Sequence, residues 1–524
     1  MSVNGVFQVW DYVVFACMLG MSAAIGIFHA FRRNGTAQGT TEDFLVGNRQ
    51  ISAYPIAFSL ASSFLSAITV IGNPAEVYTY GIMFLMFAFS WLFTMIVTCL
   101  IYIPLFYRLN IISTYEVKHL LIFSSPFKFP CFTITVICFI WDEARWITDV
   151  FMILVSVILL TGMNLWISIV MTALVCTFYT TLGGIKAVVW TDVFQVCVMF
   201  SGLLAVLIQG SIHFGGFRKI WSIAEDGGRL NFLDFDPDPR RRHTFWTIMV
   251  GGTFGWTATY GCNQAQVQRY LACKSEIDAK KAVMLNWIGM IIILSIACLC
   301  GLVLYAVYET CDPIKAGMVN NSNQLMPLLV MEILGHMPGV PGLFVASAYG
   351  GTLRYIHKYT IVDVMKWYLM GVYFECKCAC CFFCSIQAAL SVAGVIQGPI
   401  LGVFTLAALF PKSNGKGAFT GLSVGLILGM WIGIGAQIYP PSDEFTKVLK
   451  TSIAGCLEPN STISTPANIT TWTVTMINHT SQEARPSIAD NFYSLSYLYY
   501  SSVGCCSTLL VGLIVSMFTC KTGK

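Results

Sequence analysis

The segment that decides the fold is Ser59-Leu60-Ala61-Ser62-Ser63-Phe64-Leu65-Ser66-Ala67-Ile68-Thr69, which is followed by Gly72-Asn73-Pro74. It belongs to an apolar run that small and polar residues interrupt. Unpaired backbone inside lipid is tolerated only where it lines a cavity or packs against protein. Secondary transporters use such broken helices to present carbonyl groups to cations. Close helix packing through small residues explains the same pattern, so this segment alone leaves both interpretations open.

The composition of the whole chain indicates a membrane protein. Of 524 residues, 56% are hydrophobic and 11% are charged, and the mean hydropathy is +0.71. Soluble domains carry about 25% charged residues, and a soluble chain this apolar lacks the polar side chains to cover its surface. The net charge of +4 is too small to indicate a nucleic-acid partner. The expected surroundings are therefore a lipid bilayer.

Apolar runs that are long enough to cross a bilayer recur along the chain. A span needs about 20 mostly apolar residues, and on this criterion we expect about 13 transmembrane helices. Their predicted centres lie near residues 20, 62, 93, 140, 170, 200, 255, 295, 348, 380, 403, 428 and 505. The first run has Asp11 before it and Arg32-Arg33 after it, the wrong flanks for a cleavable signal peptide. The sequence predicts an all-α membrane protein with one transporter domain over residues 1–524.

Basic residues and glycosylation sequons indicate the same orientation. Lys and Arg concentrate on the cytoplasmic side of membrane proteins. If the N-terminus is extracellular, most basic clusters of this chain lie on the cytoplasmic side. The segment 211–243 disagrees, because it puts Arg240-Arg241-Arg242 outside. N-x-[ST] sequons mark extracellular loops. Four sequons fall in loops that this orientation places outside, at Asn320, Asn460, Asn468 and Asn478. We expect an N-glycosylated loop at about 441–490; the alternative is an ordinary polar loop.

The cysteines and histidines do not indicate a metal site other than one for sodium. Most of the 20 cysteines lie in apolar runs, where cysteine behaves as a small apolar residue. Cys311 and Cys456 instead fall in polar loops, and the sequence leaves open whether they form a disulfide. We find no nucleophile–base pair, phosphate loop or metal-ligand spacing, so we expect no catalytic residues, no enzyme activity and no cofactor.

Several motifs resemble one family of transporters. The strings GGIKAVVWTDVFQ at 183–195 and NQAQVQRY at 263–270 closely resemble the sodium/solute symporter family, which includes the sodium–glucose transporters. Three more strings are similar to the sodium-coupled monocarboxylate transporters: VWDYVVF at 9–15, RHTFWTI at 242–248 and GIGAQIYPP at 433–441. The resemblance spans roughly 1–116, 151–353 and 386–520, so it covers most of the chain.

The resemblance implies a fold and a function. The fold is a LeuT-type core in which five helices, at about 50–210, are repeated in inverted orientation by five more, at about 243–412. The function is sodium-driven uptake of small monocarboxylates, such as lactate, pyruvate and short-chain fatty acids, at the plasma membrane. Sodium is then the co-transported ion, and a monocarboxylate anion is the second ligand.

The resemblance also implies a sodium site and a coupling residue. Backbone carbonyls of Ser62, Leu65 and Gly351 match the sodium site that the family shares, because unwound carbonyls supply oxygens to a hard cation without a buried charge. Asp192 matches an acidic residue at the start of a core helix, and an ionisable group at membrane depth is a candidate for coupling. The alternative is that Asp192 only caps that helix after Thr191.

Three further residues match substrate-lining positions of the sugar-transporting relatives: Thr69, Thr259 and Tyr260. This resemblance makes the three residues candidates for contact with the transported anion. Each position is equally explained by helix packing, and the sequence does not separate the two roles.

Two segments depart from the family pattern, at about 117–150 and 354–385. In the second, Arg354 and Tyr355 occupy two positions where family members carry hydroxyl-bearing sodium ligands. A cation placed at a cation site repels the ion, most strongly at low dielectric. This leaves two alternative functions open: a defective or non-transporting variant of the same family, or a relative that carries another anion such as iodide or a vitamin.

Overall fold

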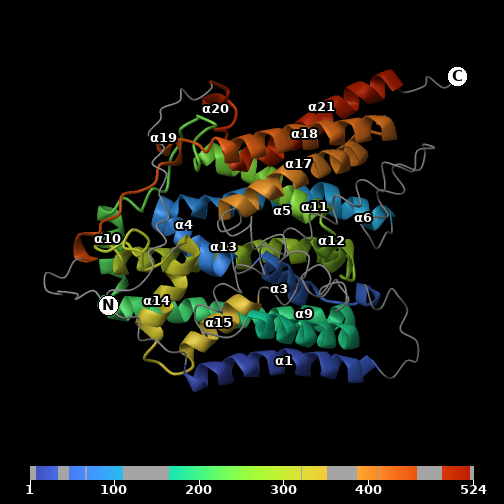
Figure 1. Cartoon of the computed structure of the whole chain (residues 1–524). Helices are drawn as coiled ribbons and strands as arrows, with labels where there is room; N and C mark the ends of the chain where they lie inside the picture. Colours follow the sequence, from blue (N-terminus) through green and yellow to red (C-terminus); the bar gives the residue numbers. More distant parts are fainter. Residues whose placement is uncertain are drawn as a thin grey trace.

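The computed structural model describes residues 8–33, 46–64, 68–109, 165–319, 321–350, 386–411, 413–456 and 487–519. Its regular elements in these ranges are helices, and strand-like pairing there is limited to one bridge, between Ile51 and Cys273. Figure 1 shows the long helices running side by side in a bundle. The prediction of an all-α protein is confirmed for the described part of the chain.

The helices follow the predicted spans closely. Predicted centres 140 and 380 lie outside the described residues, and the others fall in helices. The helical elements of the described residues include α1 (Val9–Arg33), η1 (Gly47–Arg49), η3 (Ile82–Met86), α5 (Phe87–Val97), η4 (Thr98–Tyr102), α6 (Ile103–Leu109), α13 (Glu276–Val307), η6 (Ser322–Gln324), α14 (Leu325–Leu334), α15 (Val340–Gly350), α17 (Ile386–Leu409), α18 (Gly415–Ile438), η8 (Ala454–Cys456), α20 (Ser487–Asn491), η9 (Tyr497–Tyr499) and α21 (Tyr500–Thr519). Seven described helical stretches are long and apolar enough to cross a membrane.

The described parts of the decisive segment consist of three helical elements. These are α3 (Ala53–Phe64), a π-helical turn η2 (Ile68–Gly72) and α4 (Asn73–Tyr80). Pro74 stands in the first turn of α4, where its missing N–H costs no hydrogen bond. Residues 65–67 lie outside the described residues, so the predicted break at Ser62–Ser66 is described only on its two sides.

The Gly and Thr residues that interrupt the span near 255 predict a second break near Thr257–Gly261, and the structure places it just after them, at Asn263. A π-helical stretch η5 (Thr247–Gly252) leads into α11 (Thr253–Cys262), so residues 257–261 are helical. The helix stops at Asn263, whose backbone is extended (φ −79°, ψ 125°). The Asn263 side chain accepts a hydrogen bond of 2.9 Å from the Ala265 N–H and caps α12 (Gln264–Leu271). A capping side chain therefore sets the break, and the small residues before it pack inside the helix.

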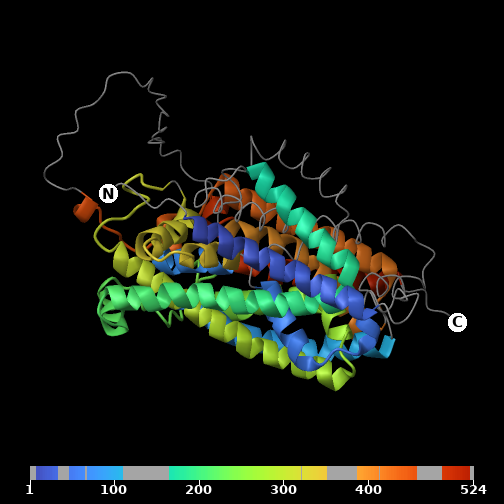
Figure 2. The same ribbon diagram turned by 90° about the horizontal axis from the view of Figure 1, so that it is seen from below.

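The spans predicted near 170 and 200 form one helix, α9 (Leu165–His213). Its 49 residues correspond to about 74 Å at 1.5 Å per residue, more than twice the hydrocarbon thickness of about 30 Å. Figure 2 shows the teal first part of α9 and its green last part running in different directions. The helical backbone thus continues through the point where the sequence predicts a loop.

The two ends of the bundle separate the segments predicted to be outside from those predicted to be inside, and we call the end with the former the outer end. In Figure 1, α10 (Phe217–Asp226) and α19 (Asp443–Thr446), from segments predicted to be outside, lie at one end. At the opposite end lie α6 and α12, which carry Arg108 and Arg269 of the predicted cytoplasmic clusters. At the outer end Cys311 and Cys456 are joined in a disulfide, which resolves the alternative that the sequence left open.

The outer arginines that violate the charge bias are neutralised by acidic partners. Each residue of the run at 240–242 lies within 3.0 Å of a carboxylate oxygen, in the pairs Arg240–Asp238, Arg241–Asp236 and Arg242–Glu76. Arg229 is buried, with its guanidinium carbon 3.8 Å from the centre of the Tyr305 ring. The orientation rule counts basic residues in short loops, and here the excess charge is matched locally by the fold.

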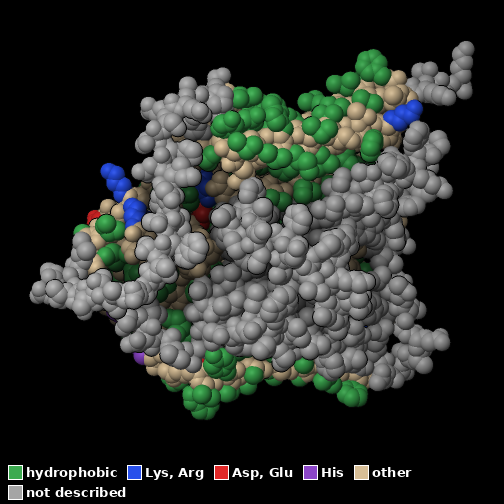
Figure 3. Space-filling model, viewed as in Figure 1, with side chains coloured by type: hydrophobic (Ala, Val, Ile, Leu, Met, Phe, Trp, Pro, Cys, Tyr) green, Lys and Arg blue, Asp and Glu red, His purple; other side chains and the backbone are tan. Residues whose placement is uncertain are grey.

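The flanks of the bundle are apolar, as a lipid-facing surface requires. Figure 3 shows hydrophobic side chains along the edge formed by α1 and over α18 and α21, while the visible Lys and Arg side chains lie mainly toward the ends. Exposed apolar residues on these helices include Ile427, Ile434 and Met517. Soluble monomers rarely expose apolar patches of this extent, so the surface agrees with a multi-pass membrane protein.

Small residues bring α18 close to α21. Glycines recur every four residues along α18, at Gly417, Gly421, Gly425 and Gly429. A Cβ atom on Gly421 would lie 2.4 Å from the Thr508 carbonyl oxygen, so only glycine fits there. This small-residue packing is typical of membrane helices.

Candidate functional site

A buried carboxylate connects three helices in the interior of the bundle. Asp192 of α9 is 1% exposed. Its Oδ2 accepts a hydrogen bond of 2.6 Å from the Ser59 hydroxyl of α3 and one of 3.2 Å from Arg269 Nη2 of α12. Burying a charge is costly unless it is paired and hydrogen-bonded, and both conditions are met. Asp192 therefore links α3, through the Ser59 hydrogen bond, to α12, through the ion pair with Arg269.

The helix-cap alternative for Asp192 is wrong. Asp192 lies inside α9, well away from either end of that helix. The Thr191 hydroxyl donates to the carbonyl oxygens of Ala187 and Val188, one turn earlier, at 3.1 and 2.8 Å. A capping residue instead has its backbone outside the helix and bonds forward. What the position provides is a buried carboxyl group paired with Arg269.

Of the three predicted sodium ligands, the structure describes one. Ser62 is buried near the end of α3, and its hydroxyl donates a 2.7 Å hydrogen bond to the Ser59 carbonyl oxygen. Leu65 and Gly351 lie outside the described residues. Ser62 is therefore linked through Ser59 to Asp192, so the predicted sodium position and the predicted coupling residue lie in one hydrogen-bond network.

The predicted substrate residues contact different helices. The Thr259 hydroxyl of α11 donates to Gln397 Oε1 of α17 at 3.0 Å. The neighbouring Tyr260 accepts a hydrogen bond at its hydroxyl from Asn286 Nδ2 of α13. Thr69, in η2, is half-buried. Thr259 and Tyr260 thus hold α11 to its neighbours, and each already has a polar partner.

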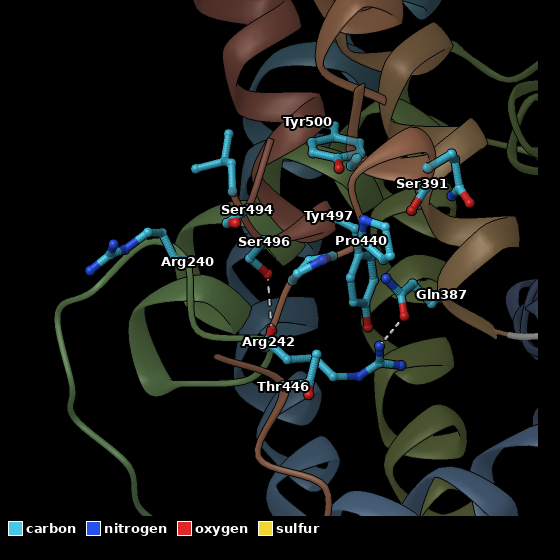
Figure 4. A pocket seen from close by; sticks show the side chains of 14 residues that line it. Arg240, Arg242, Gln387, Ser391, Pro440, Thr446, Ser494, Ser496, Tyr497 and Tyr500 are labelled. Atoms are coloured by element: carbon cyan, nitrogen blue, oxygen red, sulfur yellow. Dashed lines mark hydrogen bonds between the residues drawn. The ribbon is translucent and has the colours of Figure 1, made fainter. Parts of the chain in front are cut away.

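A second buried charge pair lies toward the outer end. Arg242 is 6% exposed and donates from Nε and Nη2 to Glu76 Oε1 of α4, at 3.0 and 2.6 Å. Its Nη1 donates to Gln387 Oε1 of α17, and Figure 4 shows this bond. Burial lowers the pKa of Arg242, but the Glu76 carboxylate more than compensates, so the pKa is raised and the guanidinium stays charged.

The neighbouring His243 is held in its neutral form. His243 lies in the loop before η5, with Nε2 2.8 Å from the Tyr497 hydroxyl and 3.7 Å from Glu76 Oε1. Burial and the positive charge of Arg242 hold the pKa of His243 well below its usual range. The outer cluster, Glu76, Arg242, His243, Gln387 and Tyr497, therefore contains one cation and one anion near neutral pH.

Comparison with known proteins assigns the chain to a family. A model of the sodium:solute symporter family matches residues 44–357, more than half of the chain. The chain belongs to the sodium:solute symporter family. The motifs at 183–195 and 263–270 predicted this membership, and the match confirms it.

Curated relatives of this sodium:solute symporter are similar along nearly its whole length. It is 45% identical to the human protein named sodium-coupled monocarboxylate transporter 1, over 98% of this chain and 88% of the relative. It is 43% identical to mouse sodium-coupled monocarboxylate transporter 2, over 98% and 84% of the two chains. Identity to the human sodium/iodide cotransporter is 40%, over 99% and 85%. These relatives are transporters, in agreement with the expectation that the chain is not an enzyme.

A solved structure shares the fold of this sodium:solute symporter. It is the substrate-bound, outward-open state of a Na+-coupled sialic acid symporter, with a TM-score of 0.70 over 98% of each chain. The two sequences are 18% identical, so the likeness concerns the fold alone.

Sequence reasoning missed several polar residues that the structure brings together. The pairs of Asp192 with Arg269 and of Thr259 with Gln397 join helices far apart in the sequence, as does the pair of Glu76 with Arg242. Each of these residues is a polar side chain within or beside an apolar segment, and this could have marked it in the sequence. Such side chains are rare in membrane helices and usually have a polar partner. One sequence without geometry does not say which partner each group finds.

The neutral state of His243 predicts a pH dependence of stability. The unfolded chain binds a proton below about pH 6.5, whereas folded His243, with its lowered pKa, does not. The free energy of unfolding therefore falls as pH drops from about 6.5 toward the folded pKa, by up to about 1.4 kcal/mol per unit. Thermal unfolding of the purified protein at pH 7.5 and 5.5 measures this loss.

His243→Gln should reduce that loss, because the amide has no proton to gain. His213→Gln, at an exposed position at the end of α9, is the matched control and should leave the pH dependence as it is. An equal loss of stability in the parent and in His243→Gln would contradict the assignment.

Proposed function

We propose that this chain couples sodium entry to uptake of a small monocarboxylate, such as lactate, pyruvate or a short-chain fatty acid, across the plasma membrane. The identity of 45% to a named sodium-coupled monocarboxylate transporter over most of both chains supports this function. The structural observation that carries it is the buried carboxylate of Asp192, which Ser59 connects to the second predicted span, near residue 62. Ionisable groups at membrane depth mark ion pathways.

In the proposed mechanism, the five-helix repeats at about 50–210 and 243–412 form an inverted core. Sodium binds carbonyl groups of Ser62, Leu65 and Gly351 at the break. Its arrival places a positive charge beside the network of Ser62, Ser59 and Asp192 and competes with Arg269 for the carboxylate. Sodium drives transport only if it binds one conformation more tightly than the other. The link between the α3 and α12 ends is a contact that such competition would loosen.

The proposed path of the monocarboxylate passes Thr69, Thr259 and Tyr260. The buried hydroxyls of Thr259 and Tyr260 are candidate donors to a carboxylate; at present Thr259 donates to Gln397, and Tyr260 accepts from Asn286. No positively charged residue is assigned to this path, so the sodium ion itself supplies the balancing charge.

Uptake of labelled lactate into cells that express the chain tests the proposal. We expect saturable uptake, with sodium raising the apparent affinity for lactate by about 5–150-fold, the usual range of coupling between two ligands. Competition by pyruvate and butyrate, with weak competition by iodide, would identify the anion class. Lactate uptake that is identical with and without sodium would refute the proposed coupling.

A second candidate is a non-transporting member of the family, favoured by Arg354 and Tyr355 at two sodium-ligand positions. Replacing residues 353–361 with the family pattern Leu-Ser-Thr-Val-Ser-Ser-Ser-Ile-Asn discriminates between the two. If the parent chain is inactive and the replaced chain takes up lactate with sodium, the parent is the defective variant. Uptake by the parent equal to that of the replaced chain excludes this second candidate.

The loop at 441–490 is proposed to be extracellular and glycosylated, although most of it lies outside the described residues. Glycosidase treatment of the expressed protein should increase its mobility on a gel. The triple variant Asn460→Gln, Asn468→Gln and Asn478→Gln should lose this response, with Asn320→Gln as a separate arm. Unchanged mobility of the parent after treatment would exclude glycosylation of the loop.

A further inference from the structure

A polar cavity lies at the outer end of the molecule, apart from the predicted sodium and substrate residues. Its volume is about 240 Å³, and α17, α18, the loop at 240–242, residues 494–497 and the first turn of α21 enclose it. Figure 4 shows side chains from these segments around one space. Gln387 at the cavity and Gln397 at Thr259 are ten residues apart on α17, about 15 Å along the helix. The cavity is therefore a separate place on the molecule.

The hydrogen-bond donors around the cavity suit an anion. Two arginines line it, each ion-paired outside the lining, Arg240 with Asp238 and Arg242 with Glu76, and none of the described lining residues is acidic. Glu76 and Gln387 fix the Arg242 guanidinium through Nε, Nη1 and Nη2. A guanidinium has five N–H groups, so one N–H on each terminal nitrogen remains. Arginine presents such groups as a planar fork that matches a carboxylate.

Two hydroxyls at the cavity have no hydrogen-bond partner among the described residues. Ser391 and Tyr500 are 7% and 3% exposed, and no hydrogen bond joins either hydroxyl to another described residue. Both line the cavity, Ser391 one turn after Gln387 on α17. Both hydroxyls can therefore donate to a ligand with acceptor oxygens in the cavity.

The size and the walls of the cavity limit the ligand. Pockets for drug-sized molecules measure about 300–1,000 Å³, and this cavity is smaller. Ala436, Pro440 and Leu495 add apolar surface beside the polar groups. This combination suits a short carbon chain that ends in one carboxylate.

We propose that the cavity is an outer docking site for the transported monocarboxylate, whose carboxylate binds Arg242, Ser391 and Tyr500 before the anion moves along α17 into the bundle. The identity of the anion rests on the proposed function. Arg242 also binds Glu76 of α4, which follows the second predicted span. The docking site is thus built on a helix of the proposed sodium pathway.

Cysteine protection tests docking without transport. Gln437→Cys places a thiol at the cavity, on an exposed residue. Its labelling by a membrane-impermeant methanethiosulfonate is compared with labelling of the parent chain, in membranes without a sodium gradient. Lactate should slow labelling, whereas lactamide, its neutral analogue, and chloride at equal ionic strength should not. Equal protection by lactamide or chloride, or no protection by lactate, would overturn the proposal.

Variants of the two hydroxyls locate the binding. Ser391→Ala with Tyr500→Phe, added to Gln437→Cys, should raise the lactate concentration for half-protection about ten- to a hundredfold, the effect of losing hydrogen bonds to a charged group. Ser423→Ala is the matched control, because its hydroxyl bonds the Phe419 carbonyl within α18. An unchanged half-protection concentration in the double variant would refute the site.

The outcomes separate this inference from the proposed function. Protection by lactate without sodium-driven uptake would leave the docking site standing and reject the transport function. Sodium-driven uptake without protection would reject the docking site alone. Where both hold, the double variant should raise the KM of uptake and leave kcat unchanged, because docking contributes binding that precedes the transport step.

Discussion

Asp192→Asn is expected to lower the free energy of unfolding by about 3–5 kcal/mol, the usual result of removing one partner of a buried ion pair. The variant leaves the Arg269 charge in the interior, where this side chain is 6% exposed. Sodium-driven uptake should also be lost, because the carboxylate is the ionised group of the network that reaches Ser62. Thermal unfolding of the purified protein and sodium-dependent uptake measure the two effects.

The double variant Asp192→Asn with Arg269→Gln separates the structural role from the coupling role. With both charges gone, most of the lost stability should return, because a buried pair replaced as a whole is often neutral. Uptake should stay absent. Asp238→Asn is the matched control: its partner Arg240 is about one-third exposed, so the cost should stay within about 1 kcal/mol. Full recovery of uptake in the double variant would exclude Asp192 from coupling.

Glu76→Gln is expected to destabilise the outer end to a similar degree, by about 3–5 kcal/mol. Arg242 would keep its charge without its only carboxylate partner within hydrogen-bond distance in the described structure. Glu76→Gln with Arg242→Gln should recover most of the loss, as measured by thermal unfolding.

Arg242→Lys tests whether charge alone suffices. Lysine keeps the positive charge but lacks the planar fork that reaches both Glu76 and Gln387 and lies 4.1 Å from the Tyr80 ring centre. We therefore expect the lysine variant to be less stable than the parent. Stability equal to the parent in either Glu76→Gln or Arg242→Lys would show that this pair does not hold the outer end together.

The sequence predicts what depends on composition and local pattern. Apolar runs located the spans, because a bilayer demands length and apolarity alone, and family motifs located Asp192 and Thr259. The sequence pattern placed the second break near Thr257–Gly261, a few residues too early. Small residues in a membrane helix can mark either close packing or an interruption, and the pattern does not distinguish the two. The structure places that break at Asn263, where one side chain caps the next helix. A single capping residue gives little signal within a long apolar pattern.

Contacts between distant residues were beyond the sequence for a different reason. Asp192 and Arg269 are separated by 77 positions, and Arg242 and Glu76 by 166. Each buried charge needs a partner of opposite charge, and the sequence offers several to each. Only the packing of the helices in space selects one of them. The cavity at Ser391 and Tyr500 is likewise made by segments far apart in the sequence, so it has no local pattern.

The disulfide between Cys311 and Cys456 has a practical consequence. It closes a covalent ring across a sequence separation of 145 residues, and in the chain-entropy description such a ring restricts the unfolded chain by about 5 kcal/mol. A protease that cuts once within residues 312–455 therefore yields two fragments that migrate as one band until a reductant is added. Two bands without reductant would show that the ring is open in the mature protein.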